Sequence, residues 1–303
     1  MTDVPTGVDL RQFLGRERVR VEVALDKALV GILPRIPEQF RGALQHGVTS
    51  GGKRLRPILC VAAYRAAGGT GDGIYQLAVS LELIHAYSLM HDDLPCMDDA
   101  DLRRGEPTTY KAHGQASTTV AGALLIPAAA LHAFESAQAM GLPDESCRRL
   151  VEELSRASGG GGMVGGQVMD LLGEGQELSA DQLDDLHRRK TGALLRASLR
   201  MGGIAAGATN DELGGLDRYG ESIGLAFQIA DDLLDATSSA QELGKNPSDA
   251  ELGKSTYVSL FGVEEAGRKG RELVSAAMVA LDDVGLISPE LDALARYIVE
   301  RKR

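Results

Sequence analysis

The amino-acid sequence predicts an all-α protein, built as one helical bundle. No stretch of useful length alternates between apolar and polar residues, as a half-buried strand would. Helix start and stop signals recur along the chain instead. The composition, 44% hydrophobic but only 4% aromatic with no tryptophan, suits closely packed helices. Because no Pro/Ser-rich linker divides the 303 residues, we expect residues 1–303 to form a single domain.

The first half of the chain carries three helical signals. A long amphipathic run extends from Leu10 to Leu33 and is stopped by Pro34. Pro57 can occupy the first turn of a second helix. A third helix is predicted from apolar residues that recur at helical spacing and give it one buried face: Ile74, Leu77, Ala78, Leu81, Ile84 and His85.

The second half is divided by capping signals and glycines. Ser179 with Gln182, and Thr209 with Glu212, have the spacing of capping boxes. Ser288 before Pro289 is a cap followed by a first-turn proline. Three glycine-rich stretches, 68–71, 159–162 and 202–203, are predicted to separate helices. The four-glycine run lacks the following Lys-Ser/Thr of a phosphate loop, so we interpret it as a break or a close helix contact.

The net charge and the apolar stretches limit the possible partners and location. A net charge of −11 argues against nucleic-acid binding and against general binding to anionic membranes. The N-terminal residues show no secretory signal. The longest apolar stretch, Val120 to Phe134, is too short for a membrane span of about 20 residues. Three cysteines without CxxC spacing, interpreted as buried or semi-buried thiols, suit a reducing compartment: Cys60, Cys96 and Cys147. We therefore expect a cytoplasmic protein without stable membrane insertion.

An acidic cluster follows the third predicted helix. Its five aspartates are Asp92, Asp93, Asp98, Asp99 and Asp101. Pro95 should break the helix near Leu94, because proline lacks an N–H and clashes with the preceding turn. Carboxylates this dense would repel one another unless cations share them. Oxygen ligands with few thiols or imidazoles favour a hard ion, most naturally Mg²⁺.

A second acidic cluster occurs between Phe227 and Asp235. Asp231 and Asp235 are four residues apart, so they share one face of a helix, and Asp232 lies beside them. The surrounding residues are apolar, which is not typical of a solvated helix face. We infer that the two clusters form facing walls of one cavity, with metal ions between them.

Basic residues accompany both clusters. Lys53, Arg54 and Arg56 follow a glycine pair just before a helix start, where phosphate oxygens are bound favourably. Taken singly, each basic residue is more often a solvated surface charge. Together they predict clamps for anions, with further members elsewhere: Arg103, Arg104, Lys190 beside Thr191, Lys245 and Lys254, together with the polar Gln228.

Six ordered motifs give the sequence a specific family resemblance: GGKRLRP, HAYSLMHDDLPCMDDADLRRG, GGQVMDL, HRRKTGALLRA, FQIADDLLD and LGKSTY. Together they resemble the trans-isoprenyl diphosphate synthase (polyprenyl synthetase) family, and within it bacterial farnesyl diphosphate synthases most. The resemblance implies the isoprenoid synthase fold, an all-α bundle around a deep central cavity, usually as a homodimer. It also implies head-to-tail condensation of an allylic diphosphate (dimethylallyl or geranyl) with isopentenyl diphosphate.

The resemblance assigns roles residue by residue. Three Mg²⁺ ions would be held by Asp92, Asp98, Asp231 and Asp235, with Asp93 assisting catalysis. Isopentenyl diphosphate would be held by Gly52, Lys53, Arg56, His85 and Arg104. The allylic diphosphate would meet Arg103, Lys190, Lys245 and Lys254. The developing allylic cation would be stabilised by Lys190, Thr191 and Gln228. Alone, His85 would more often be a satisfied core histidine.

Product length should depend on the floor of the cavity. Tyr87 and Ser88, five and four residues before Asp92, should lie below the metal site, with Ile84 one turn deeper. The large ring of Tyr87 favours a C15 product over C20. Many relatives carry Asp and Gln where this chain has Ala123 and Ile126, which leaves C20 open.

Two other classes remain as alternatives. A class I terpene cyclase would share the metal chemistry but would not need GGKRLRP for a second diphosphate. A non-catalytic subunit of a prenyl synthase would typically have lost one acidic motif. The basic C-terminus, 301–303, could fold over the diphosphate or form a frayed tail.

Overall fold

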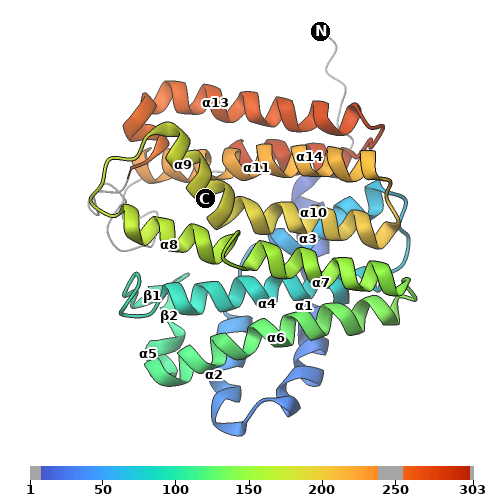
Figure 1. Ribbon diagram of the computed structural model, residues 1–303, viewed down its shortest axis with the longest axis vertical. Helices are drawn as coiled ribbons and strands as arrows, with labels where there is room; N and C mark the ends of the chain where they lie inside the picture. Colours follow the sequence, from blue (N-terminus) through green and yellow to red (C-terminus); the bar gives the residue numbers. More distant parts are fainter. Residues whose placement is uncertain (1–7, 238–254, 301–303) are drawn as a thin grey trace.

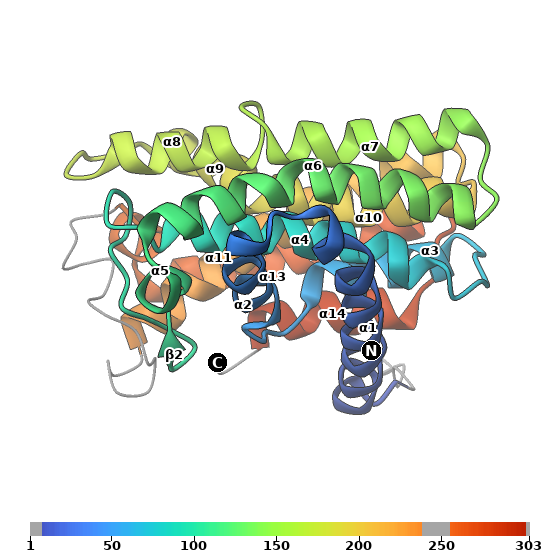
Figure 2. The ribbon, with the colours of Figure 1, turned by 90° about the horizontal axis from the view of Figure 1, so that it is seen from below.

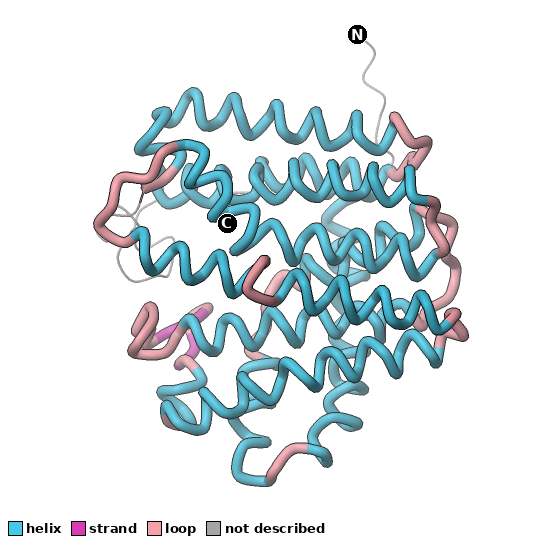
Figure 3. The backbone as a smooth tube through the Cα atoms, in the orientation of Figure 1, coloured by secondary structure: helices cyan, strands magenta, loops and turns pink. Residues whose placement is uncertain are grey.

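The computed structural model describes residues 8–237 and 255–300, and helices make up most of this part of the chain (Figure 3). The predicted all-α fold is therefore confirmed. The N-terminal half consists of α1 (Leu10–Ile32), η1 (Leu33–Arg35), α2 (Glu38–Thr49), α3 (Leu55–Ala66), α4 (Ile74–Asp92), α5 (Thr109–His113) and α6 (Gln115–Ala139). The C-terminal half consists of α7 (Asp144–Ser158), α8 (Met163–Gly173), α9 (Ala180–His187), the π-helix η2 (Arg188–Gly192), α10 (Ala193–Ala206), α11 (Asn210–Thr237), α13 (Tyr257–Asp282) and α14 (Pro289–Glu300).

Helix α4 lies in the middle of the bundle (Figures 1 and 2). It packs against α1, α2, α3, α6 and α10, and α11 packs against α10, α13 and α14. The predicted single buried face of α4 was wrong, because residues on all sides of this helix are buried, including the polar Ser80 and Glu82. A helix surrounded by neighbours needs apolar residues around its whole circumference.

Local chemistry places most helix ends where the sequence predicted them. Helix α1 ends just before Pro34, and Pro57 lies in the first turn of α3. The Ser179–Gln182 capping box is formed in both directions. The Thr209 hydroxyl accepts the Glu212 N–H at 3.3 Å, and the Ser288 hydroxyl accepts the Leu291 N–H at 3.2 Å. These side chains satisfy amide groups that a helix start leaves without partners.

Two local predictions, for Gly202–Gly203 and for Cys96, were wrong, and one short hairpin was not predicted. Gly202 and Gly203 lie inside α10 rather than between helices, because α10 approaches α3 closely: a Cβ at Gly202 would lie 2.2 Å from the Cys60 carbonyl oxygen. A short hairpin, β1 (Leu102–Arg103) with β2 (Glu106–Pro107), interrupts the helical chain. Cys96 is exposed, whereas the other two cysteines are buried.

The apolar stretch from Val120 to Phe134 lies within α6, which is longer than the stretch itself. By length and composition alone, this 25-residue helix could cross a membrane. A core helix passes the same test, and one such helix is weak evidence for a span. Helix α6 packs against α2, α4 and α7, and Pro127 lies inside it.

Candidate active site

The first acidic cluster forms a turn at the end of α4. The helix ends at Asp92, three residues before Pro95, as predicted. The chain then folds back, because the Asp98 N–H donates to the Asp92 carbonyl at 2.9 Å and the Ala100 N–H donates to the Asp93 carbonyl at 3.2 Å. Two of the aspartates predicted to bind metal, Asp92 and Asp98, are thereby brought onto one turn.

The environment of Asp92 disfavours the charged form of its carboxyl group. Burial raises the pKa of its carboxyl group to about 6, and the negative charges of Asp98 and Asp93 add to this effect. Lys190 and Arg103 act in the opposite direction but do not cancel it. Burial penalises the charged form of this carboxyl group, and a bound cation would favour the charged form.

Asp93 and Arg103 are engaged with each other. The Arg103 guanidinium donates to the Asp93 carboxylate through Nη2 at 2.6 Å and through Nε at 2.8 and 3.0 Å. The Asp93 side chain is only 4% exposed. Their predicted roles in catalysis and diphosphate binding therefore compete with a tight ion pair in this structure.

The second acidic cluster lies on the C-terminal part of α11. This end of α11 and the end of α4 lie at the same end of the bundle, on the left of Figure 1. Asp232 is buried and accepts the Tyr257 N–H at 2.7 Å, so it fixes the start of α13. Asp231 and Asp235 are partly exposed. The charge of Asp231 acts on Arg56, which places this aspartate near the basic residues discussed below.

Lys190 and Thr191 lie on the π-helix η2, between α9 and α10. Single-turn π-helices are frequent at functional sites. The Lys190 ammonium is 2.5 Å from the Asp170 carboxylate of α8. Gly166 permits the close approach of α8 to the η2 backbone, since a Cβ there would lie 2.2 Å from the backbone nitrogen of Lys190.

Two cavities meet at Lys190. The first has a volume of about 320 Å³ and is lined by side chains from four helical elements, including Arg56, His85, Tyr87, Ser88, Asp92, Gln167, Lys190 and Thr191. The second, of about 110 Å³, is lined by Lys190, Asp170, His187, Gln228 and Asp232. Lys190 thus links the α4 aspartates to the α11 cluster. Apolar residues complete the first cavity: Leu89, Met97, Met163, Val164, Val168 and Leu171.

A group of basic residues lies on the other side of Asp92. Arg56 Nε and His85 Nδ1 are buried and form no hydrogen bond within residues 8–237 and 255–300. Burial lowers the pKa of Arg56 to about 10 and the pKa of His85 well below its usual value, so His85 is neutral at pH 7. The Arg104 guanidinium lies over Gly52 and donates to the Gly51 carbonyl. Buried donors without partners suit an anionic ligand.

One basic residue of the predicted clamps, Arg54, lies apart from this arrangement. Arg54 faces the core, where it donates to Glu82 at 2.6 Å and to Glu22 at 2.9 Å. It is therefore not part of an anion clamp, because its charge is already neutralised. Lys245 and Lys254 lie outside the described residues, as does the basic C-terminus. Lys53 is exposed.

Three residues that line these cavities were not predicted from the sequence. Gln167 is buried, and neither of its amide atoms has a hydrogen-bond partner in the described part of the chain. His187 is also buried, which lowers its pKa to about 4, and its ring stacks on Tyr257 at 5.6 Å. Asp170 pairs with Lys190. Gln167 and Asp170 belong to the GGQVMDL motif, which was the signal available.

The side chains at this site are chemically suited to bind Mg²⁺. Within residues 8–237 and 255–300, no group of three or more His, Cys, Asp or Glu side chains is close enough to hold a metal ion. The available donors are nevertheless carboxylate oxygens, which Mg²⁺ prefers. Burial, the largest cause, raises the pKa of Asp92, and a bound cation would lower it again. The residues present therefore fit a divalent cation.

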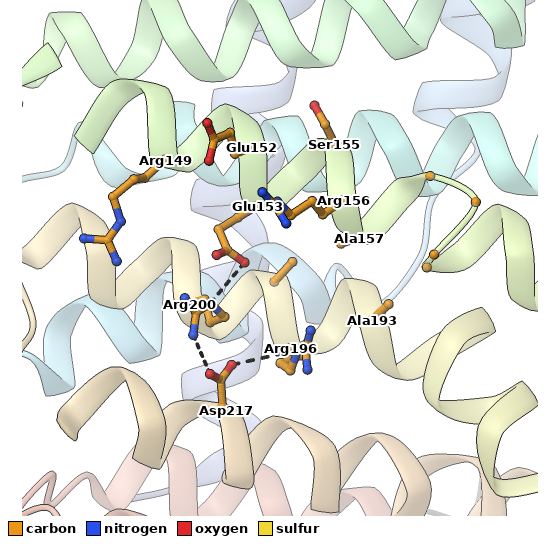
Figure 4. Close-up of a pocket in the computed structure, with 15 residues that line it drawn as sticks. Arg149, Glu152, Glu153, Ser155, Arg156, Ala157, Ala193, Arg196, Arg200 and Asp217 are labelled. Atoms are coloured by element: carbon orange, nitrogen blue, oxygen red, sulfur yellow. Dashed lines mark hydrogen bonds and ion pairs between the residues drawn. The ribbon is translucent and has the colours of Figure 1, made fainter. Parts of the chain in front are cut away.

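A larger cavity, of about 670 Å³, lies elsewhere, between α7, α10 and α11 (Figure 4). Two of its arginines are already engaged: Arg200 pairs with Glu153 at 3.0 Å and also with Asp217, which Arg196 approaches at 3.8 Å. None of the predicted site residues lines it. Size alone does not make this cavity the active site, because its charges largely neutralise one another.

Comparison with known proteins agrees with this geometry. The polyprenyl synthetase family model matches residues 37–284. Farnesyl diphosphate synthase of Escherichia coli (strain K12) is 43% identical, over 86% of this chain and 88% of that protein. Geranylgeranyl pyrophosphate synthase 12 of Arabidopsis thaliana is 38% identical, over 97% of this chain and 82% of that protein. The crystal structure of an FPP/GFPP synthase from Zymomonas mobilis superposes with a TM-score of 0.81 and 36% identity, covering 94% of this chain and 98% of that one.

The helical fold and its matches define an enzyme of the trans-prenyltransferase class with an isoprenoid synthase fold. The chain belongs to the polyprenyl synthetase family, as the six motifs predicted. Membership implies Mg²⁺-dependent catalysis on isopentenyl diphosphate and an allylic diphosphate.

Proposed function

We propose that this prenyltransferase condenses isopentenyl diphosphate with dimethylallyl and geranyl diphosphate, and that its main product is farnesyl diphosphate (C15). The observation that carries the proposal is the cavity of about 320 Å³, with Asp92 and Lys190 among its lining residues and the large ring of Tyr87 on its wall. Such a cavity suits a diphosphate at one end and a short apolar chain at the other. The similarity to the E. coli enzyme supports the C15 product.

The Mg²⁺ ions, three by analogy with the family, would be held by Asp92, Asp98, Asp231 and Asp235. When bound, Mg²⁺ neutralises the diphosphate and makes it a better leaving group. Lys190 and Arg103 bind the remaining oxygens of the allylic diphosphate, together with Lys245 and Lys254, and Asp93 orients Arg103. Arg103 would have to shift from Asp93 toward the substrate when the diphosphate is bound.

The second substrate occupies the basic side of the cavity. Gly52, Lys53, Arg56, His85 and Arg104 hold isopentenyl diphosphate, with the buried Arg56 and His85 donating from Nε and from the neutral ring. Once the allylic C–O bond breaks, the double bond of isopentenyl diphosphate attacks the cation. The Lys190 carbonyl and the Thr191 and Gln228 side chains stabilise that positive charge in a dry pocket. The departed diphosphate then accepts the proton lost from the product.

The alternatives are less well supported. The plant relative keeps a C20 product open. A terpene cyclase would have no use for the group around Arg56 and Gly52. A silent subunit would typically lack one aspartate cluster, whereas this chain has both.

We also propose a cytoplasmic homodimer with no nucleic-acid partner. Helix α6 exposes Val120, Leu131 and Phe134, with relative exposures of 37%, 44% and 37%. A second copy of the chain would cover this apolar face. A mass near 32 kDa in sedimentation, rather than twice that value, would contradict the dimer.

The function is tested by incubating purified protein with Mg²⁺, labelled isopentenyl diphosphate and C5, C10 or C15 allylic diphosphates separately. We expect C15 product from the C5 and C10 partners, little turnover of the C15 partner, and loss of turnover in a chelator. Cyclic hydrocarbon would support a cyclase, and inactivity with all three partners would support a silent subunit. Efficient extension of the C15 partner would favour the C20 product.

Tyr87→Ala is expected to lengthen the main product to C20 or beyond, because the ring lies on the wall of the cavity that the growing chain must enter. Product chromatography after incubation with geranyl diphosphate measures this. The matched control, Tyr87→Phe, keeps the ring and should keep C15. An unchanged product from Tyr87→Ala would remove Tyr87 from the floor.

A further inference from the structure

Another cavity, lined mainly by apolar residues, lies on the other side of Tyr87 from the substrate cavity. It has a volume of about 310 Å³, and Tyr87 and Val164 line both this cavity and the substrate cavity of about 320 Å³. Its other lining residues come from α4, α6 and α7, among them Ile84, Ile126, Pro127, Ala130 and Leu154. The Tyr87 ring is therefore a partition between two spaces of similar size. If the ring turned aside, the space for a prenyl chain would about double.

Apart from its apolar packing, the Tyr87 ring has one aromatic contact that fixes its orientation. The Tyr87 hydroxyl forms no hydrogen bond to any residue among 8–237 and 255–300. The aromatic neighbour of the Tyr87 ring is His91, one turn along α4, at 5.0 Å between centroids with an edge-to-face angle of 78°. Edge-to-face pairs at this distance stabilise the orientation of both rings.

His91 is itself fixed to the neighbouring helix. Its Nε2 is 3.0 Å from the Thr119 carbonyl oxygen on α6, which requires the tautomer that carries the proton on Nε2. Helix α6 approaches closely enough because residue 122 is glycine. A Cβ at Gly122 would lie 2.4 Å from His91 Nε2 and 2.5 Å from Cδ2, so any larger residue must displace the imidazole.

We propose that His91 is a positioning residue that determines product length through Tyr87. It lies in a recess left by Gly122, is hydrogen-bonded to the Thr119 carbonyl of α6, and holds the Tyr87 ring across the entrance to the cavity of about 310 Å³. We call this arrangement of His91 the clamp. Loss of the clamp lets the ring turn aside and the growing chain pass. This inference rests on the proposed function, since it needs Tyr87 to form the floor.

The test compares four variants by the ratio of C20 to C15 product at equal turnover, with geranyl diphosphate as the allylic substrate. His91→Ala removes the clamp, and Gly122→Ala displaces the imidazole from a helix that carries no aspartate cluster. Both are expected to raise the ratio of C20 to C15 product by about tenfold, because each removes one aromatic pair and one hydrogen bond that hold the Tyr87 ring in place. His91→Phe restores a ring beside Tyr87 and should give a smaller rise than His91→Ala. Thermal melting checks that each variant is folded.

Tyr87→Ala separates failure of the clamp from failure of the proposed floor. If Tyr87→Ala lengthens the product while folded Gly122→Ala keeps the parental ratio, the clamp is overturned and the floor stands. If His91→Ala and His91→Phe lengthen the product equally, the ring contact plays no part and the clamp is overturned. If Tyr87→Ala itself changes nothing, the floor assignment fails, and the clamp fails with it.

Discussion

An Asp92→Asn variant is expected to lose at least about 10³-fold in kcat/KM, because a neutral amide binds Mg²⁺ more weakly than a carboxylate and does not offset its charge. The same variant should be more stable than the parent protein in metal-free buffer. Asp92 is partly exposed but largely desolvated, and its pKa is raised from 3.8 to about 6. Activity and stability are therefore opposed at this one side chain.

The pH dependence of this stability gain has a definite sign. Because the folded protein raises the pKa of Asp92, the folded state binds a proton more tightly than the unfolded chain does. The parent loses stability as pH rises from about 4 to about 6, where Asp92 ionises, and the loss stays constant above that range. We expect Asp92→Asn to be about 1–3 kcal/mol more stable at pH 8, with a difference that vanishes near pH 4.

Urea unfolding of chelator-treated protein at several pH values, together with the prenyltransferase assay, measures both effects. Added Mg²⁺ should stabilise the parent more than the variant. Asp101→Asn is the matched control: Asp101 lies on the same loop with its side chain 66% exposed, and we expect little change in either measurement. A fully active Asp92→Asn variant, or one that is less stable at pH 8, would contradict the assignment.

An Arg54→Met variant is expected to lose about 3–5 kcal/mol of stability, the typical effect of removing one partner of a buried ion pair. The Arg54 side chain is 2% exposed and lies between Glu22 and the buried Glu82, whose side chain is 4% exposed. Methionine fills much of the volume but leaves Glu82 charged and without its partner. Urea unfolding at pH 7 measures the loss.

A second substitution distinguishes the buried charge from lost packing. Adding Glu82→Gln to Arg54→Met removes the stranded carboxylate and should recover part of the stability. Arg35→Met is the comparison at the surface, where both side chains of the Arg35–Glu135 pair are about half exposed, and should cost less than about 1 kcal/mol. A loss below 1 kcal/mol from Arg54→Met would show that the core pair does not hold α3 to α1 and α4.

Much of the fold follows from local signals, such as helix caps, that can be recognised in the sequence alone. The helix start at Ser179 is predictable because the cap and its partner lie three residues apart. Gly202 illustrates the opposite case. A glycine that ends a helix and a glycine that admits a neighbouring helix look alike in the sequence, and only the approach of the Cys60 carbonyl distinguishes them.

The candidate site divides in the same way. The residue types of the two aspartate clusters and of GGKRLRP are sufficient by themselves to indicate Mg²⁺ ions and clamps for anions. The reaction of diphosphates is what the family resemblance of the six motifs implies. Only the tertiary structure decided which charges are already engaged: Arg54 with Glu82, and Arg103 with Asp93. It also decided that Gly122 of α6 leaves room for His91 of α4. Ion pairs and recesses depend on which helices become neighbours, and that depends on the packing of the whole chain.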